Sequence, residues 1–299
     1  MTHVVRYESG GVVLVGVLGD GAVRPVPGVG SMAELLGGDL AGARSAVEAA
    51  AGEPAVPVGE VRLLPPVDGL TEVWASGVTY ERSMDARVEE SQVQDVYSRV
   101  YAADRPELFL KSVAWRVVTD GEPIAVRPDS AVTVPEPELA AVVTATAEVF
   151  GYTVCDDVSS RDIEGENPLY LPQAKIYAGS CALAPGIRPA WEVPDASALT
   201  IDVRVTRAGA PVFAGSTSTA RMHRSVADLV SHLVAAQDFP AGAVLSTGTG
   251  IVPDLDFTLL EGDEVQVTVE HVGILTNPVG TLEAARTAAA RRVPSGPVR

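Results

Sequence analysis

The chain has 299 residues, of which 46% are hydrophobic and 20% charged, and these values predict a soluble globular protein with a large core. Its net charge of −17 opposes binding to nucleic acid or anionic membranes, and no apolar stretch approaches the roughly 20 residues of a membrane span. The start of the chain has neither a basic segment nor a long apolar run, so we expect a cytoplasmic location.

Residues 1–68 are expected to form a small N-terminal α/β domain. The apolar stretch at 10–18 is typical of a strand, and residues 31–52 have helical character, with Ser31 placed to cap the first turn. Two adjacent prolines within 61–69 then mark a boundary with the longer second part of the chain.

Residues 69–285 are expected to form a β-rich domain, which places the protein in the α+β class. The 28 glycines and 22 prolines favour many strands and turns. Apolar or alternating segments predict strands at 72–80, 107–113, 132–144, 149–159, 199–209, 244–250 and 263–277. Helices are predicted at 81–104, which is polar, and at 225–236, which has an apolar face. Residues 286–299 are basic and end in proline and glycine, so we expect a flexible tail.

The two cysteines, Cys155 and Cys181, lie in apolar segments of the predicted strands. We expect two buried, reduced thiols, because a chain of this length does not need a disulfide to fold. The four histidines are scattered and none has ligand spacing with a cysteine, which argues against a zinc site.

Acidic residues interrupt two of the predicted strands. In "VTVPEPEL" at 132–139, Glu136 and Glu138 are two residues apart and therefore point to the same face, while Pro137 favours a strand edge or a bulge. In "GYTVCDDVSSRD" at 151–162 the same alternation lets one of Asp156 and Asp157 face the glutamates. Three carboxylate ligands suit Mg²⁺, Mn²⁺ or Ca²⁺. On this pattern alone, acids exposed to solvent at strand ends are the favoured interpretation.

The segment that follows, 159–185, mixes charged, aromatic, proline and glycine residues without strand or helix periodicity. Long irregular segments beside strand ends tend to carry function. Lys175 lies inside this segment between two apolar residues, an unusual place for a lysine that only contacts solvent. Lys111, in the predicted strand at 107–113, is expected to support the site or to pair with a buried acid.

Several motifs resemble the fumarylacetoacetate hydrolase family in order and spacing: "LFLKS", "PEPELA", "GYTVCDDVSSRD", "QAKIY", "LSTGTG" and "GDEVQVTVEHVGILTNPVG". The resemblance covers roughly residues 70–280. It implies a rolled mixed β-sheet domain with a smaller N-terminal domain, a homodimer or higher homo-oligomer, and Mg²⁺ or a similar ion. By position, it implies that the metal ligands are Glu136, Glu138 and Asp157, that the active-site lysine is Lys175, and that the backbone at Gly248 and Thr249 binds the substrate carboxylate.

One departure from the family bears on the reaction. Family hydrolases carry N-Y-x-x-H after the strand at 72–78, whereas this chain has "TYERSMDAR", with Ser83 at the position of the histidine. An aspartate also stands at 156 where the family usually has asparagine. Because a serine cannot act as a general base near neutral pH, the family's usual hydrolysis of a C–C bond is in doubt.

Within the family, "RPELFLKS" and "RDIEGENPLYLPQAKIYAGSCALAP" are most similar to the 2-keto-3-deoxy-D-arabinonate dehydratase branch. The resemblance implies a metal-dependent hydro-lyase that converts a 2-keto-3-deoxy sugar acid to 2,5-dioxopentanoate through a metal-stabilised enolate. We assign catalysis to Lys175 and Glu136, with Lys175 as the candidate for proton transfer; a salt bridge to Glu136 or Asp157 is the alternative role for this lysine. The expected substrate-binding residues are Ser83, Arg161, Tyr170, Gly248 and Thr249.

Other activities stay open for the sequence. A C–C hydrolase or a decarboxylase of an acylpyruvate or another β-keto acid would use the same metal and the same 2-oxo acid recognition. A tautomerase acting on a specialised-metabolite intermediate and a non-catalytic binding protein are further alternatives. In each catalytic case the expected partner is a small 2-oxo acid, with no nucleic acid or membrane involved.

Overall fold

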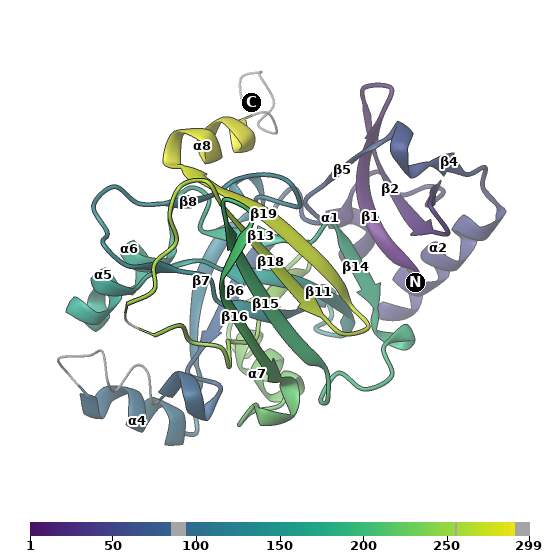
Figure 1. Cartoon of the computed structure of the whole chain (residues 1–299). Coiled ribbons are helices and arrows are strands. Elements are labelled where there is room, and N and C mark those ends of the chain that lie inside the picture. Colours follow the sequence, from purple (N-terminus) through teal and green to yellow (C-terminus); the bar gives the residue numbers. More distant parts are fainter. Residues whose placement is uncertain (85–93, 255, 291–299) are drawn as a thin grey trace, which may run out of the picture.

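A computed structural model describes residues 1–84, 94–254 and 256–290 of the chain. Within these residues the fold is α+β and rich in strands, as predicted, with one large mixed sheet, a second sheet of five strands and a two-stranded ribbon (Figure 1). The large sheet has the order β4-β3-β2-β1-β14-β11-β10-β17-β6-β7, and β5 and β13 pair outside this path with β1 and β11. The second sheet has the order β16-β15-β18-β19-β8.

The N-terminal part contributes five strands and two helices. The strands are β1 (His3–Ser9), β2 (Val12–Gly19), β3 (Ala22–Pro25), β4 (Val56–Pro57) and β5 (Arg62–Leu64). The helices α1 (Met32–Leu36) and α2 (Leu40–Ala49) begin at Ser31 and Asp39, whose side chains accept hydrogen bonds from the backbone N–H three residues on. The predicted cap at Ser31 is therefore confirmed.

The N-terminal strands continue directly into the rest of the large sheet. Val4 of β1 pairs with Ile187 of β14, and one hydrophobic cluster includes Val4, Met32 and Phe150 together. Figure 1 shows this part at one side of the molecule, with α5 and α6 at the opposite side. The boundary between residues 68 and 69 remains a prediction.

The remaining strands form the body of the molecule. Those of the large sheet and the ribbon are β6 (Glu72–Gly77), β7 (Glu107–Val113), β9 (Thr133–Val134), β10 (Pro137–Val143), β11 (Val149–Asp157), β12 (Ser159–Ser160), β13 (Cys181–Leu183), β14 (Gly186–Pro189) and β17 (Ala243–Ser246). Those of the second sheet are β8 (Ile124–Val126), β15 (Thr200–Arg207), β16 (Ala210–Ser218), β18 (Asp263–Val269) and β19 (Gly273–Thr281). Every residue of β10 is buried, whereas residues of β18 alternate between buried and exposed, so β10 is a central strand and β18 has one face towards solvent.

The helices of this part are α4 (Gln94–Ala102), α5 (Arg161–Glu166), α6 (Leu171–Lys175), α7 (Val226–Leu233) and α8 (Leu282–Ala290). The predicted helix at 81–104 is seen at 81–84 and in α4, while residues 85–93 lie outside the described part of the chain. Helix α8 extends to Ala290, so residues 286–290 of the expected flexible tail are helical. No helix in the described part of the chain has both the length and the apolar character needed to cross a membrane.

The segment 159–185 is more ordered than predicted. It contains α5, a 3-10 turn (Pro168–Tyr170), α6 and β13. Pro168 and Pro172 lie in the first turns of the second and third of these elements, where a missing backbone N–H costs nothing. With five or six residues each, α5 and α6 are too short to show a helical period in the sequence.

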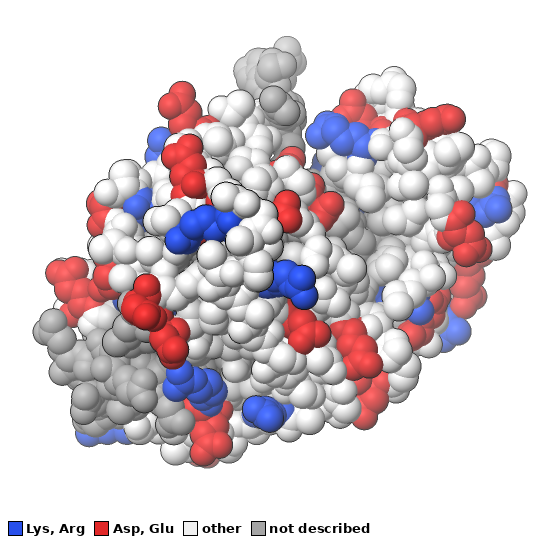
Figure 2. All heavy atoms as spheres, viewed as in Figure 1, with Lys and Arg blue, Asp and Glu red and all other residues white. Residues whose placement is uncertain are grey.

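Charged side chains lie in small separate groups over the face shown in Figure 2, with acidic and basic residues interspersed. The net charge of −17 therefore forms no single acidic field on that face. Recognition of an anion must come from a local arrangement inside the fold.

Candidate metal centre and active site

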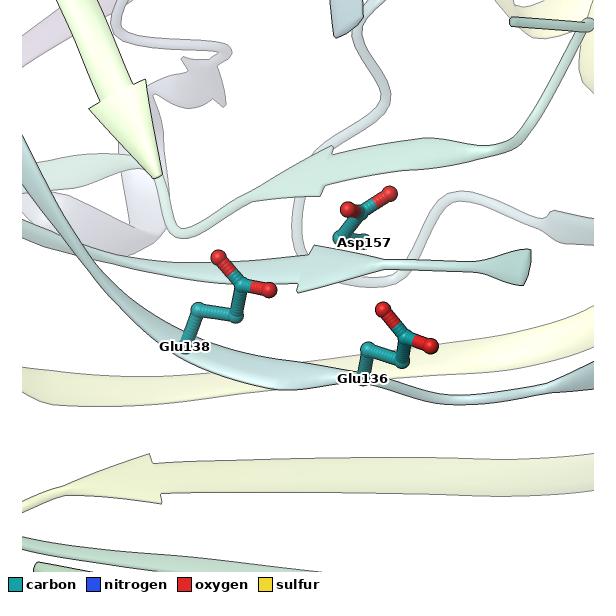
Figure 3. Close-up of side chains that lie close together, drawn as sticks. All are labelled: Glu136, Glu138 and Asp157. Carbon is teal, nitrogen blue, oxygen red and sulfur yellow. The ribbon is translucent and has the colours of Figure 1, made fainter. Parts of the chain in front are cut away.

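Three carboxylates converge where β10 and β11 pair. Glu138 is opposite Cys155 in the antiparallel register, and the N–H of Asp157 donates to the carbonyl oxygen of Glu136 at 2.9 Å. The strand pleat therefore places Glu136, Glu138 and Asp157 on one face, as Figure 3 shows. One oxygen from each residue lies within 4.8 Å of the others, and all three residues are buried. Among the described residues, this is the one group of three such ligands.

Pro137 sits between the two glutamates because the sheet is incomplete at that point. Strand β17 pairs with β10 only from Ala140 onwards, so Pro137 has a ladder partner on one side alone, Asp156 of β11. A residue without an N–H is tolerated at such a position. The predicted edge character holds locally, although β10 as a whole lies inside the sheet.

The aspartate pair divides as the alternation predicts. Asp157 faces the glutamates, whereas Asp156 points away and its Oδ1 accepts a hydrogen bond from the backbone N–H of Glu136 at 2.9 Å. Burial raises the pKa of Asp156 to about 7. Asp156 therefore supports the backbone of Glu136, while Asp157 belongs to the cluster itself.

Two buried ammonium groups compensate the carboxylates. Lys175 Nζ lies 2.5 Å from Glu136 Oε2 and 3.1 Å from Asp157 Oδ2, and it also donates to Ser159 Oγ. Lys111 Nζ lies 2.5 Å from the other oxygen of Asp157, Oδ1. The sequence suggested both lysines, and the structure places their ammonium groups at the same carboxylate.

Among the described residues, Glu138 is held by a hydroxyl and a backbone N–H rather than by either lysine. Its Oε2 accepts hydrogen bonds from Ser246 Oγ at 2.5 Å and from the N–H of Gly248 at 2.7 Å. Burial, followed by the nearby charge of Asp157, raises the pKa of Glu138 well above its ordinary value. Burial thus disfavours the charged form of Glu138, and a bound dication would stabilise that form.

The donor set fits a hard divalent ion. All three ligands are carboxylates, they are buried, and their oxygens are close enough for a single ion. Both cysteines are buried free thiols, as expected, and neither joins the cluster. Glu136, Glu138 and Asp157 are therefore the residues that would hold Mg²⁺, Mn²⁺ or Ca²⁺.

A hollow of about 440 Å³, including its open mouth, extends from the carboxylates. Its lining combines acidic, basic and hydroxyl side chains with a small apolar portion formed by Val78, Phe109, Leu171 and Val252. The remaining lining residues are Ser76, Gly77, Ser83, Glu107, Glu136, Glu138, Asp157, Arg161, Glu164, Lys175, Gly248 and Thr249.

Four of the five expected substrate-binding residues line this cavity: Ser83, Arg161, Gly248 and Thr249. Tyr170, half-exposed at the end of the 3-10 turn, is not among the described residues that line it. The side chain of Ser83 is already engaged locally, because its Oγ donates to the carbonyl oxygen of Tyr80 at 2.7 Å.

The N–H of Gly248, which the family resemblance assigns to the substrate, makes a contact within the protein. This N–H donates to Glu138 rather than standing open for a substrate carboxylate. The backbone reaches this position with φ +90°, a conformation natural to glycine, and a Cβ here would lie 2.0 Å from Thr79 Oγ1. In this structure, Gly248 orients the carboxylate of Glu138.

Two further acids in the cavity were not predicted, Glu107 and Glu164. Glu164 is three residues after Arg161 in α5, so the two side chains lie on the same face of the helix, and both are buried. The spacing would have shown this pair only if α5 had been predicted as a helix. Glu166, the last residue of the same helix, is exposed.

Comparisons with known proteins agree with the geometry. The family model for the C-terminal domain of fumarylacetoacetate (FAA) hydrolase matches residues 72–280. The chain is 42% identical over 226 residues to the 2-dehydro-3-deoxy-D-arabinonate dehydratase of Saccharolobus solfataricus, covering 74% of this chain and 76% of that protein. It is 47% identical over 217 residues to a probable 2-keto-3-deoxyxylonate dehydratase of Haloferax volcanii, covering 73% and 74%.

A solved structure of 2-keto-3-deoxy-D-arabinonate dehydratase, complexed with magnesium and 2,5-dioxopentanoate, is similar to the whole fold. The TM-score is 0.80 at 33% sequence identity, and the match covers 94% of this chain and 99% of that one. The likeness thus includes the N-terminal part, which lies outside the family model.

Proposed function

Because the chain belongs to the fumarylacetoacetate hydrolase family, we propose that it is a Mg²⁺-dependent hydro-lyase that dehydrates a 2-keto-3-deoxy sugar acid. The substrate is 2-keto-3-deoxy-D-arabinonate or a close relative, and the product is 2,5-dioxopentanoate. The observation that carries the proposal is the buried group of Glu136, Glu138 and Asp157 beside Lys175, at the end of a small polar cavity. Two dehydratases of such acids at 42% and 47% identity support it.

Glu136, Glu138 and Asp157 hold the ion. When bound, a divalent cation supplies Lewis acidity that makes the C3 proton of a 2-oxo acid easier to remove. It also reverses the local charge, so that an anionic substrate can enter a protein with a net charge of −17.

The reaction needs a group that moves a proton at C3, and Lys175 supplies it. Lys175 Nζ is buried in the cavity wall, 5.9 Å from the centre of the Phe109 ring, and bulk water has little access to it. Its bonds to Glu136 and Ser159 orient the amine.

The chemistry balances without a redox partner. Loss of the C3 proton and of hydroxide from C4 releases one water and leaves a C3–C4 double bond. A proton then leaves C5 and another joins C3, which gives an enol at C4–C5. This enol becomes the C5 aldehyde of 2,5-dioxopentanoate. Arg161, Ser83 and Thr249 face the cavity and would bind the hydroxyl groups of the chain.

A C–C hydrolase is the second candidate, and the residue at 83 argues against it. Ser83 has no ionisable group near neutral pH, and its hydroxyl is bonded to the backbone of Tyr80. The cavity also carries Glu107 and Glu164, whose carboxylates suit a polyhydroxylated substrate better than an apolar acyl chain.

Product analysis separates these activities. The protein would be stripped with EDTA, reloaded with Mg²⁺, and incubated with 2-keto-3-deoxy-D-arabinonate, an acylpyruvate or oxaloacetate. We expect the sugar acid to lose one water and yield an aldehyde that is detectable by mass spectrometry. Formation of a shorter acid, of CO₂ or only of a tautomer from the other substrates, with the sugar acid unchanged, would refute the dehydratase proposal.

The assembly and the location belong to the same proposal. We propose a homodimer or a higher homo-oligomer in the cytoplasm. Trp115 is 51% exposed at a groove that is also lined by Tyr177 and Leu282, and a large exposed aromatic ring supports a protein interface. Light scattering after size-exclusion chromatography would give the mass, and a monomeric mass would contradict the assembly.

A further inference from the structure

We propose that Lys111 is a positioning residue that ties the metal ligand Asp157 to the backbone of Lys175. It thereby fixes where the proton-transferring amine lies relative to the metal centre. The inference rests on the proposed function for the role of Lys175, while the contacts themselves are independent of it.

The chain uses lysine at two positions only. Of its 22 basic residues, all but Lys111 and Lys175 are arginines. Both lysines lie at the carboxylate cluster, 0% and 2% exposed. An ammonium is a compact point charge with three donors, whereas a guanidinium is a wide planar fork. The distribution indicates that both positions need the compact group.

The three donors of Lys111 match three acceptors. Reaching in from β7, its Nζ lies 2.5 Å from Asp157 Oδ1 and donates to the carbonyl oxygens of Val158 at 3.1 Å and Lys175 at 2.5 Å. A buried charge is tolerated only when it is paired and hydrogen-bonded in this way. One ammonium therefore connects three segments: β7, the end of β11 and the end of α6.

The hydrogen bond from Lys111 to the Lys175 carbonyl lies at the C-terminal end of the short helix α6. Helix α6 has five residues and Lys175 is the last of them, so the Lys175 carbonyl has no donor within the helix. That carbonyl accepts from Lys111 Nζ and also from Ser180 Oγ at 2.8 Å. Because an isolated helix of this length is not stable, these two bonds help to fix the position of the Lys175 backbone.

Lys111 and Lys175 hold opposite oxygens of Asp157, Oδ1 and Oδ2. Asp157 is therefore held from both sides, and its carboxylate links the two ammonium groups directly.

A double-mutant cycle tests the inference through activity. We expect Lys111→Met to lower kcat about 100-fold, the size of effect that a 1 Å misplacement of a reacting group can have. KM and the Mg²⁺ dissociation constant, measured by calorimetry on EDTA-stripped protein, should change less than about fivefold. Because Lys111 acts through Lys175, Lys111→Met/Lys175→Met should be no slower than Lys175→Met alone. If the losses of kcat in the two single variants multiply in the double variant, the inference is overturned. An unchanged kcat in Lys111→Met would overturn it as well.

A second variant covers the case in which Lys111→Met does not fold. Ser180→Ala removes the other hydrogen bond to the Lys175 carbonyl, and we expect a smaller loss in kcat, about tenfold, that disappears in the Lys175→Met background. Arg207→Met is the matched control, because it removes an ion pair with buried Asp263 far along the chain from the cluster. A loss of kcat in the control equal to that in Lys111→Met would contradict the positioning role.

Nuclear magnetic resonance gives a readout that needs no substrate. With only two lysines, protein labelled at the lysine Cε carbon gives two side-chain signals, and each single variant assigns the other. We expect the Lys175 signal to shift or broaden in Lys111→Met and to stay unchanged in Arg207→Met. An unchanged Lys175 signal in Lys111→Met would refute the inference even if no substrate were turned over. Absence of dehydration by the wild type would instead refute the proposed function.

Discussion

Replacing Asp156 with asparagine changes a buried carboxyl group that lies behind the metal ligands. Asp156 is fully buried, its Oδ1 accepts the N–H of Glu136, and its Oδ2 has no hydrogen-bond partner among the described residues. Burial raises its pKa from 3.8 to about 7. Asparagine keeps the acceptor for Glu136 and cannot ionise, so it removes the titration without removing that bond.

The sign of the effect follows from linkage. Between pH 4 and 7 the unfolded chain has already released the Asp156 proton while the folded chain still holds it, so the folded state binds more protons and its stability falls as the pH rises. At about 1.36 kcal/mol per unit of pKa, this carboxyl group removes about 2.5 kcal/mol from the free energy of unfolding between pH 5 and 8. Most of the change comes below pH 7, above which the curve flattens.

Urea unfolding of EDTA-treated wild type and Asp156→Asn at pH 5, 6, 7 and 8 measures this difference. We expect the free energy of unfolding of Asp156→Asn, relative to that of wild type, to increase by about 2.5 kcal/mol from pH 5 to pH 8. Asp202→Asn is the control, because Asp202 is exposed on β15, and its pH profile should parallel that of wild type. Parallel profiles for wild type and Asp156→Asn would show that the Asp156 carboxyl group is already ionised in the folded protein.

Three further predictions concern the metal centre. Gly248→Ala should destabilise the protein by about 2 kcal/mol or more in urea unfolding, because φ is +90° and the new Cβ would meet Thr79 Oγ1; a smaller loss would mean that the loop relaxes easily. Glu138→Gln should weaken Mg²⁺ binding in calorimetry about tenfold or more, since one of three anionic ligands is lost; unchanged affinity would remove Glu138 from the ligand set. Mg²⁺ at about 100 times its dissociation constant should stabilise the wild type by about 2.7 kcal/mol over the EDTA-treated form in urea unfolding, and equal stability with and without the ion would exclude a folded-state metal site.

Local patterns were sufficient for much of the fold. The alternating segments at 199–209 and 263–277 became strands β15, β18 and β19, and the predicted cap at Ser31 begins α1. These features depend on neighbouring residues only, so the chain order contains the necessary information. Helices α5 and α6 were not predicted, because their few residues cannot display a helical period and their ends are determined by contacts from other segments.

The sequence by itself determined that Glu136 and Glu138 share a face, because the pleat of a single strand requires it, and the order of several motifs indicated the family. Strand alternation alone left open which aspartate joins them; the family motif pointed to Asp157, and the register between β10 and β11 places it there. Only the tertiary structure decided that the Gly248 N–H binds Glu138 across 110 residues and that Lys111 reaches both Asp157 and Lys175. Such contacts join segments far apart in the chain, so no local spacing in the sequence predicts them. They form because the strands pack into one sheet and bring these polar groups together in a buried space, where each needs a hydrogen-bond partner.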